Sequence, residues 1–488
     1  MRTLNIAMIV RTLCMLLLFE AAFMLVPIIV ALSNHETGAL QAFAISFCVT
    51  LCAGLGGYLF IKPSRSELNK YDSVLLTSLV WVIFSLFGLL PYMLAPTTQL
   101  SFSAAFYEAM SGFTTTGASL IETTDELSKA IHIWRCLSQW IGGLGIIIIT
   151  LALIPMFNSS GGMQMFNAEQ NKISQEKVSP RISNTARRLW AVYILLTIAL
   201  FGLLCIGPMT VFESACHAFT TMATGGLSTS SQGINQFSTV YVKVIITLFM
   251  FLGGVNFAMV YRASTGQFRS VVSNEPFKMY CKIIGLTTIA FIVCIVAENA
   301  VSDWQSVTID PLFQVVSFIT STGYILSDYS NWGPAVIIIS LMLIFMGGCA
   351  GSTSGGAKVD RLIYMGKFLH NEIRKAMRPN SVWALRINNK VATVGTINRV
   401  IAFLLFYVLI IIVGAFLLCI TGFSIDNAFM SALAAMANSC LSITTPTISG
   451  DYAMMGASAH YILSALMLIG RLEIMTVLVL FSRSFWRG

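Results

Sequence analysis

The chain has 488 residues, of which 56% are hydrophobic and only 10% are charged. A soluble protein carries about 25% charged residues, so this composition excludes a water-soluble globular protein and indicates a membrane protein with many spans. The formal net charge of +8 becomes informative only when the basic residues are placed along the chain.

Ten apolar segments are long enough to cross a bilayer, which requires about 20 apolar residues. The first begins near the N-terminus and lacks a small-residue cleavage site, so we expect it to remain as a span. The predicted fold class is therefore an all-α integral membrane protein with ten spans. These lie at about 7–31, 39–61, 73–94, 132–157, 187–206, 238–260, 278–297, 334–363, 399–420 and 458–482.

Basic residues gather in loops on one side of this predicted topology, and the loops between them carry acids with almost no bases. By the positive-inside rule the basic side, with both termini, is cytoplasmic. The same loops could instead form a docking face for an acidic partner. The basic segments are the N-terminus, 62–70, 172–188, 262–282, 358–399 and 483–487.

Four short stretches resemble one another, and three of them contain a Thr-Gly pair. Glycine adopts positive φ cheaply, so it can turn neighbouring carbonyls toward a common axis. Rings of such carbonyls can replace the water shell of a cation. Thr-Gly pairs could also be simple helix-end signals, but their repetition favours a single-chain pore with fourfold pseudosymmetry. The stretches are 111–119, 220–228, 318–324 and 437–442.

A unit of span, short helix, filter-like loop and span recurs after the first two spans, as expected for transporters and channels. We expect four such units around one central pore, at 67–160, 184–265, 275–368 and 392–488, preceded by a two-helix extension at 1–66. The short helices, at 102–113, 210–222, 309–320 and 425–436, are too short to cross a membrane. Their C-terminal dipole ends would converge on the pore and favour a cation.

The eighth span is interrupted by a segment rich in glycine and serine, Gly347–Lys358. Five glycines in ten residues cannot hold a helix, because each costs about 1 kcal/mol relative to alanine. Below the third filter stretch such a loop is interpreted as a gate. A phosphate-binding loop is the alternative, but Ala357-Lys358-Val359 stands where that motif needs Lys followed by Ser or Thr.

Three motifs resemble those of the TrkH/TrkG/KtrB superfamily of bacterial K⁺ uptake proteins: the segment 347–358, Gly470-Arg471-Leu472-Glu473, and the Thr-Thr-Thr-Gly of the first unit. The resemblance covers nearly the whole chain, and the two extra N-terminal spans are similar to the TrkH branch. It implies K⁺ uptake through a homodimer in the bacterial cytoplasmic (inner) membrane. It also implies a cytosolic TrkA-like partner that binds nucleotide. The chain itself is then expected to carry K⁺ as its transported ion, with no organic cofactor and no nucleic-acid partner.

The resemblance assigns the filter glycines to Gly117, Gly225 and Gly323. Neighbouring residues would lend backbone carbonyls. The full expected filter is Thr115, Thr116, Gly117, Ala223, Thr224, Gly225, Ser321, Thr322, Gly323, Asn438, Ser439 and Cys440.

The expected gate combines the glycine-rich loop with one arginine of the tenth span. Its residues are Gly347, Gly348, Gly351, Ser352, Thr353, Ser354, Gly355, Gly356, Lys358 and Arg471. An unpaired charge at mid-span costs at least about 2.5–3.5 kcal/mol. Arg471 is therefore either a tethered cation that faces the gate loop or half of a structural ion pair, with Glu473 or an acid of another unit. Glu20, in the first span, is assigned no transport role.

The fourth unit departs from the pattern, because no glycine lies between Gly422 and Gly450. An ungapped alignment puts Cys440 at the glycine position, and a one-residue gap puts Leu441 there. A left-handed conformation costs a non-glycine residue about 1–2 kcal/mol. This quadrant is thus expected to have a different carbonyl geometry, and a Na⁺ or poorly selective monovalent-cation permease is the alternative function.

An enzyme is the alternative from another class. The chain contains no His-Glu-x-x-His and no Gly-x-Ser-x-Gly, and its five histidines are scattered without metal-ligand spacing. We therefore expect no enzymatic activity.

Overall fold

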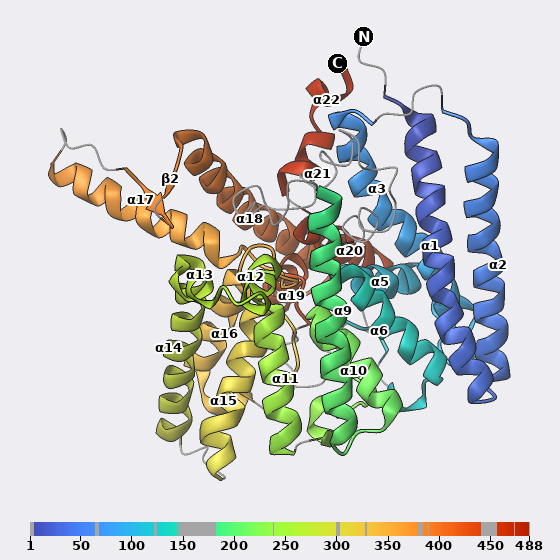
Figure 1. The fold of residues 1–488 in the computed structure, drawn as a ribbon, viewed down its shortest axis with the longest axis horizontal. Helices are drawn as coiled ribbons and strands as arrows, with labels where there is room; N and C mark the ends of the chain where they lie inside the picture. Colours follow the sequence, from blue (N-terminus) through green and yellow to red (C-terminus); the bar gives the residue numbers. More distant parts are fainter. Residues whose placement is uncertain are drawn as a thin grey trace.

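The computed structural model describes residues 4–63, 68–121, 124–143, 145, 182–237, 239–298, 303–326, 329–378, 384–388, 390–440, 456–472 and 474–487. Within these ranges the regular secondary structure is helical apart from one small hairpin, Arg386–Ile387 (β1) with Lys390–Val391 (β2). Figure 1 shows long helices at the periphery and several short ones at mid-height. The start of α1 (Ile6–Ser33) and α22 (Arg483–Arg487) lie at the same end of the molecule (Figure 1).

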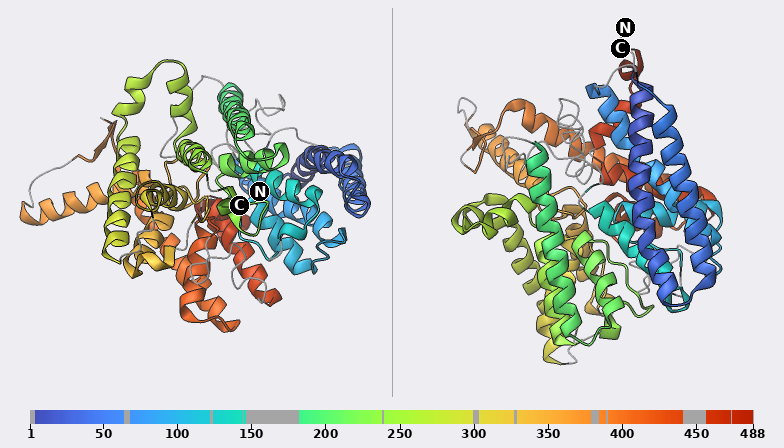
Figure 2. Two further views of the ribbon diagram at one scale, coloured as in Figure 1. Left: turned by 90° about the horizontal axis from the view of Figure 1, so that it is seen from below. Right: turned by 45° about the vertical axis from the view of Figure 1, so that its right-hand side comes forward.

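The first two helices form an antiparallel pair at one edge of the molecule, α1 with α2 (Thr37–Phe60) (Figure 2). The inner helix, α1, packs on α3 (Lys70–Gly88) and α6 (Lys129–Gly143). Helices α1 and α2 are the segment expected to precede the repeated units.

Among the residues that the structure describes, six segments are helical, long and apolar enough to cross a membrane. They are α1, α2, residues 71–94 (α3 with α4, Leu90–Leu94), α9 (Ile182–Ile206), α14 (Glu275–Ala297) and α18 (Val394–Ile420). The expected fourth span begins as α6, and of its residues beyond Gly143 only Gly145 is among those described.

Two more spans are bent helix pairs. The helices α11 (Val240–Gly253) and α12 (Phe257–Ser264) meet at 109°, and α20 (Ala457–Arg471) and α21 (Ile474–Leu480) meet at 119°. The sequence analysis expected a break only in the eighth span, which indeed divides into α16 (Pro334–Met346) and α17 (Val359–Met377). In the sixth span the break follows Gly253-Gly254, and the Asn256 side chain caps the new helix by accepting from the Ala258 N–H at 2.8 Å.

Four short helices end near the centre of the molecule: α5 (Phe102–Phe113), α10 (Val211–Ala223), α15 (Trp304–Ile319) and α19 (Ile425–Met436). Ser101, Thr210 and Ser424 cap three of them by accepting a backbone hydrogen bond, which fixes where each helix starts. The third begins five residues earlier than expected and contains Pro311. The remaining elements are the single-turn helices η1 (Thr124–Glu126), η4 (Gly233–Phe237) and η5 (Tyr329–Trp332), and α13 (Phe268–Ser273).

Candidate ion pathway

All four short helices end in the same backbone turn. Each is followed by a non-glycine residue of positive φ: Thr115 (59°), Thr224 (56°), Ser321 (55°) and Asn438 (48°). The next residue then donates its N–H to the carbonyl five positions back. These bonds join Thr116 to Ser111 (2.9 Å), Gly225 to Thr220 (2.9 Å), Thr322 to Ser317 (3.0 Å) and Ser439 to Ala434 (2.9 Å). The shared hydrogen bonds define which residues of the four units are equivalent.

This equivalence corrects the expected register of the second unit. Two residues after the left-handed residue, φ is positive again at Gly117 (76°), Gly226 (75°) and Gly323 (81°). Gly226, not Gly225, is thus the counterpart of the other two glycines. Gly225 takes the place of Thr116 and Thr322, and Ala223 takes that of Thr114. The prediction was one residue out because the Thr-Gly-Gly of this unit offers two glycines.

The filter-like segments interlock in the order of the sequence. A β carbon added at Gly117 would overlap the Gly225 carbonyl oxygen, and one added at Gly226 would overlap that of Thr322. One added at Gly323 would lie 2.6 Å from the Cys440 oxygen. Finally, the Asn438 amide donates to the Thr116 hydroxyl at 3.1 Å. The four segments therefore form a closed ring in which the fourth returns to the first.

In the fourth unit, Cys440 occupies the glycine position, because Ser439 makes the hydrogen bond that defines the register. The ungapped alignment is the one the structure adopts, and Leu441 lies outside the described residues. Cys440 is not among the described residues of positive φ. Its backbone therefore differs from that of the three glycines and carries no left-handed strain.

The residues of the ring are polar without being acidic. The side chains of Thr116, Thr322 and Ser439 are fully buried, and none of the residues equivalent to 115–117 is a carboxylate. Carbonyl and hydroxyl oxygens suit a dehydrated monovalent cation.

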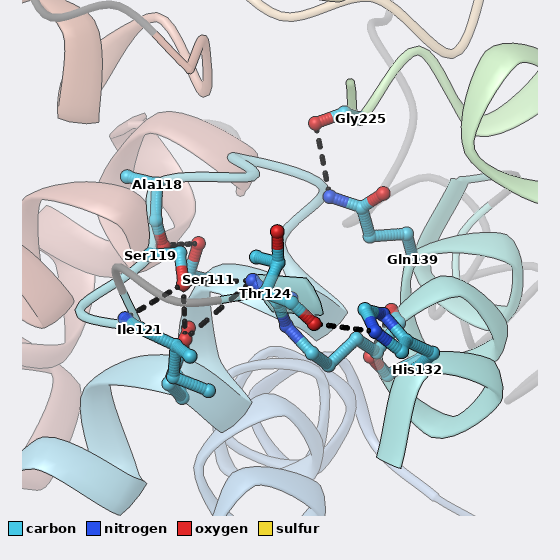
Figure 3. Close-up of polar contacts among 11 residues, drawn as sticks. Ser111, Ala118, Ser119, Ile121, Thr124, His132, Gln139 and Gly225 are labelled. Atoms are coloured by element: carbon cyan, nitrogen blue, oxygen red, sulfur yellow. Dashed lines mark hydrogen bonds and ion pairs between the residues drawn. The ribbon is translucent and has the colours of Figure 1, made fainter. Parts of the chain in front are cut away.

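One of these carbonyls is held from outside the ring. Gln139, fully buried in α6, donates its amide to the Gly225 carbonyl at 2.9 Å (Figure 3). The sequence analysis missed Gln139, although an amide in an apolar span is a signal that could have found it.

The glycine-rich loop between α16 and α17 is non-helical, as expected. Its turns use positive φ at Gly347 (69°), Gly351 (80°) and Gly356 (78°), and Lys358 also has φ 73°. The loop is fixed by hydrogen bonds to the break between α11 and α12. Cys349 and Thr353 donate to the carbonyls of Gly254 (2.9 Å) and Gly253 (3.2 Å), Phe257 donates to that of Gly351 (3.1 Å), and the Asn256 amide donates to that of Ala350 (2.8 Å).

The same loop contacts the ends of three short helices. The Thr353 hydroxyl donates to the Met222 carbonyl at 3.2 Å, and the Gly355 N–H donates to the Ser321 hydroxyl at 2.7 Å. A β carbon at Gly355 would overlap the Ala437 carbonyl oxygen. Ser352 and Ser354 bond to each other at 2.8 Å, and Lys358 donates to the Ser354 carbonyl. The loop therefore packs against the filter-like ring on the side where the short helices end.

Arg471 joins this loop to the first unit. Its guanidinium donates to the Thr353 carbonyl at 3.0 Å and to the carbonyls of Gly142 and Gly143 at 2.5 and 2.6 Å. It thus faces the loop, and these three hydrogen bonds go to backbone oxygens rather than to carboxylates; Glu473 lies outside the described residues. The sequence analysis missed that Gly470-Arg471 aligns with Gly142-Gly143, Gly253-Gly254 and Gly347-Gly348. The arginine replaces the second glycine of a pair present in the other three units.

Glu20 lies on α1 and faces α3, where a β carbon added at Gly88 would lie 3.2 Å from its Oε1. Its side chain is fully buried, and neither carboxylate oxygen has a hydrogen-bond partner among the described residues.

Comparisons with known proteins agree with this architecture. The model of the TrkH family, described as a cation transport protein, matches residues 39–272 and 279–487. The Trk system potassium uptake protein TrkH of Escherichia coli is 32% identical over 484 residues, covering 98% of this chain and 99% of that protein. TrkI of Halomonas elongata, also named a Trk system potassium uptake protein, is 32% identical and covers 99% of this chain and 97% of its own.

A solved structure shows the same fold. The crystal structure of the potassium transporter TrkH from Vibrio parahaemolyticus superposes with a TM-score of 0.88 at 29% identity, covering 99% of this chain and all of the other. The expected all-α membrane fold is confirmed by this likeness.

Proposed function

The chain belongs to the TrkH family of cation transport proteins, and from this premise we propose that it is the pore-forming subunit of a K⁺ uptake system. It is a transport protein and not an enzyme. The observation that carries the proposal is the closed ring of four segments, in which each of three glycines packs on a carbonyl of the following unit. The names of the related proteins, which specify potassium uptake, support K⁺ as the cargo.

In this proposal the carbonyls of three residues per unit replace the hydration shell of K⁺. The corrected register removes Ala223 from the set and adds Gly226. The proposed filter is Thr115, Thr116, Gly117, Thr224, Gly225, Gly226, Ser321, Thr322, Gly323, Asn438, Ser439 and Cys440.

The loop 347–358 and Arg471 act together as the closed gate. The loop contacts the ends of three short helices, and Arg471 places a cation beside it. A fixed positive charge opposes the passage of another cation. Hydrogen bonds to α11 and α12 hold the loop, so opening requires them to break.

Family membership also supports the proposed setting. We place the chain as a homodimer in the bacterial cytoplasmic membrane, with both termini in the cytoplasm and a TrkA-like nucleotide-binding partner on that side. The basic residues of α17, which directly follows the loop, give such a partner access to the gate.

A Na⁺ or poorly selective monovalent-cation permease is the second candidate. Cys440 favours it, because the fourth quadrant lacks the positive φ that the other three have at the glycine position. A ring with one different quadrant holds its oxygens at unequal distances from the axis.

The test is growth rescue of a host that lacks its own K⁺ uptake systems, on limiting K⁺ and then with added Na⁺. Rescue that persists in Na⁺ is expected. The control variant is Gly117→Ser, which alters the proposed filter and leaves the gate and Arg471 intact. It should rescue growth poorly when Na⁺ is added. Failure of the wild-type chain to rescue, despite normal amounts in the membrane and co-expression of its partner, would overturn K⁺ uptake. Rescue abolished by Na⁺ would favour the second candidate.

A further inference from the structure

One position of the short helices is polar in all four units, seven residues before the left-handed residue. It is occupied by Glu108, His217, Gln314 and Ser431, and all four are buried. The residue types differ, so the first three quadrants carry an acid, an imidazole and an amide at the same place. In each of these three, the side chain bonds to the segment that leaves the filter glycine.

In the first quadrant the contact is charged. The Ser119 hydroxyl donates to the Glu108 carboxylate at 2.5 Å and accepts from the Arg135 guanidinium at 2.7 Å. Arg135 also lies 3.8 Å from the carboxylate, and the Ile121 N–H donates to the same hydroxyl at 3.1 Å (Figure 3). Hydrogen bonds to ionised groups are about twice as strong as neutral ones, so this segment is held firmly.

The second quadrant repeats the arrangement with neutral groups. His217 bonds to the Ser228 hydroxyl at 3.0 Å through Nε2 and to the Glu213 carbonyl at 2.8 Å through Nδ1. A carbonyl only accepts, so Nδ1 carries the proton and Nε2 of the neutral ring accepts from Ser228. The Ser230 N–H donates to Ser228 at 3.3 Å, as that of Ile121 does to Ser119. Ser228 is the counterpart of Ser119.

The third quadrant uses an amide on the backbone itself. Gln314 donates to the Tyr324 carbonyl at 3.2 Å and accepts from the Leu326 N–H at 3.3 Å. The Ser317 hydroxyl reaches the same Tyr324 carbonyl at 2.8 Å. Its counterpart in the first quadrant, Ser111, reaches the Ala118 carbonyl at 2.6 Å. In the fourth quadrant that position is Ala434, which has no hydroxyl.

We propose that Glu108, His217 and Gln314 are positioning residues that set ion selectivity, each by holding the exit segment of its own quadrant. The inference rests on the proposed filter. A carbonyl ring discriminates between ions through the placement of its oxygens, and each of these residues bonds to the chain within three residues of the filter glycine. Glu108 and His217 bond to a serine hydroxyl two residues after it, and Gln314 bonds to backbone groups one and three residues after it. The first quadrant, with its charged contact, is the most firmly held and contributes most to discrimination.

The test compares three serine-to-alanine variants in proteoliposomes, with K⁺ and Na⁺ flux measured separately. Ser119→Ala and Ser228→Ala remove the two hydroxyls. Ser214→Ala is the matched control, because Ser214 is fully buried one turn before His217 and its hydroxyl has no partner among the described residues. We expect the K⁺ to Na⁺ flux ratio to fall about fivefold in Ser228→Ala, the change that loss of one hydrogen bond gives, and to fall further in Ser119→Ala, where the lost contacts are charged. The control should keep the wild-type ratio.

Two further variants keep the outcome interpretable. Glu108→Gln retains an acceptor for Ser119 but loses the charge, so its ratio should fall less than that of Ser119→Ala. Gln314→Leu tests the third quadrant should either serine variant fail to fold. Equal loss of both fluxes, with the ratio unchanged in every folded variant, would show a merely structural role and overturn the inference.

Gly117→Ser separates this failure from failure of the proposed filter. If Gly117→Ser lowers the ratio and the anchoring variants do not, the filter stands and the positioning role is wrong. If Gly117→Ser also leaves the ratio unchanged, the filter assignment itself is wrong.

Discussion

At the scale of single residues, the surroundings of each α carbon decide what the ring tolerates. Gly226 has φ 75° and faces the Thr322 carbonyl, so a methyl group meets rigid backbone. Gly225 faces the side chain of Gln139 instead, and φ there is not positive. The two adjacent positions thus favour glycine for different reasons: backbone conformation at Gly226 and side-chain contact at Gly225.

We expect Gly226→Ala to be more damaging than Gly225→Ala. The first substitution adds about 1–2 kcal/mol of left-handed strain to an overlap with backbone, while the second displaces a side chain. Thermal melting of the purified protein and K⁺ flux would measure the difference. Equal effects of the two variants would contradict the corrected register.

Substitution of Gln139 tests whether its hydrogen bond to the Gly225 carbonyl contributes to selectivity. The equivalent positions of the second and fourth units are Met250 and Met467, so methionine fits this place in the fold. Gln139→Met should leave the amount of folded protein unchanged and lower the K⁺ to Na⁺ flux ratio, because the Gly225 carbonyl loses a hydrogen bond worth about 1 kcal/mol. A ratio equal to wild type would mean that the bond has no part in selectivity.

Cys440→Gly concerns the quadrant that lacks a glycine. Glycine restores access to positive φ, so we expect normal folding and a sharper preference for K⁺ over Na⁺, measured as a flux ratio. A poorer or unchanged ratio would mean that this quadrant is adapted to cysteine.

The sequence predicted the residues of the ring more securely than their register. Three Thr-Gly stretches and the ungapped position of Cys440 were readable from the spacing. The choice between Gly225 and Gly226 was not, because it depends on where α10 ends, and a helix end is set by capping and packing rather than by the motif alone. Gln139 acts across units, and the Glu108 network joins side chains of two helices and a loop within the first unit; one-dimensional spacing reveals neither.

At the scale of elements, broken helices organise the centre of the molecule. The break between α11 and α12 receives the glycine-rich loop, and Asn256 serves both. One side-chain oxygen caps α12, and the amide nitrogen holds the Ala350 carbonyl of the loop. The sequence analysis recognised Gly347-Gly348 as a break but overlooked Gly253-Gly254, because the apolar run around it was long enough for an uninterrupted span.

Because Asn256 uses different atoms for its two contacts, one substitution can remove the contact to the loop and keep the helix cap. Asn256→Asp keeps the oxygen that caps α12 but replaces the donor to Ala350 with a second acceptor, so the loop should be released. We expect higher cation leak into proteoliposomes without partner, and a melting temperature near that of wild type. Leak through the double variant Asn256→Asp with Arg471→Ala shows whether the Asn256 and Arg471 contacts restrain the same loop.

Removing the gate directly should have a larger effect. Deletion of several residues within 350–356, or Arg471→Ala, should raise basal leak and reduce dependence on the partner protein, since the obstruction or its charge is gone. Partner-free flux no higher than wild type in both variants would exclude this segment as the closed gate.

At the scale of the whole molecule, the ring closes through a contact between residues 322 positions apart, Asn438 and Thr116. Asn438 also donates to the Met467 carbonyl at 2.9 Å. It therefore ties the last unit both to its own second helix and to the first unit. The other neighbouring units follow one another in the sequence, so the chain itself brings them together. The fourth and first units do not, and they meet through contacts such as the one between Asn438 and Thr116.

A double-mutant cycle measures the energy of the hydrogen bond between Asn438 and Thr116. Asn438→Gly keeps a backbone suited to φ 48° while removing the amide, and Thr116→Val removes the hydroxyl. We expect a coupling of about 0.5–1.5 kcal/mol in the melting of the two single variants and their combination, the range of one hydrogen bond. Strict additivity would contradict a direct hydrogen bond between Asn438 and Thr116.

Because one continuous chain supplies all four quadrants, every side chain of the ring is present once per pore. A channel built from four identical subunits must accept each substitution four times. In this protein a mutation alters one quadrant of the ring and leaves the other three unchanged. Cys440 likewise gives one thiol per ring, since the other residues of the proposed filter carry none, so a soft metal such as Ag⁺ that reacted there would do so with unit stoichiometry.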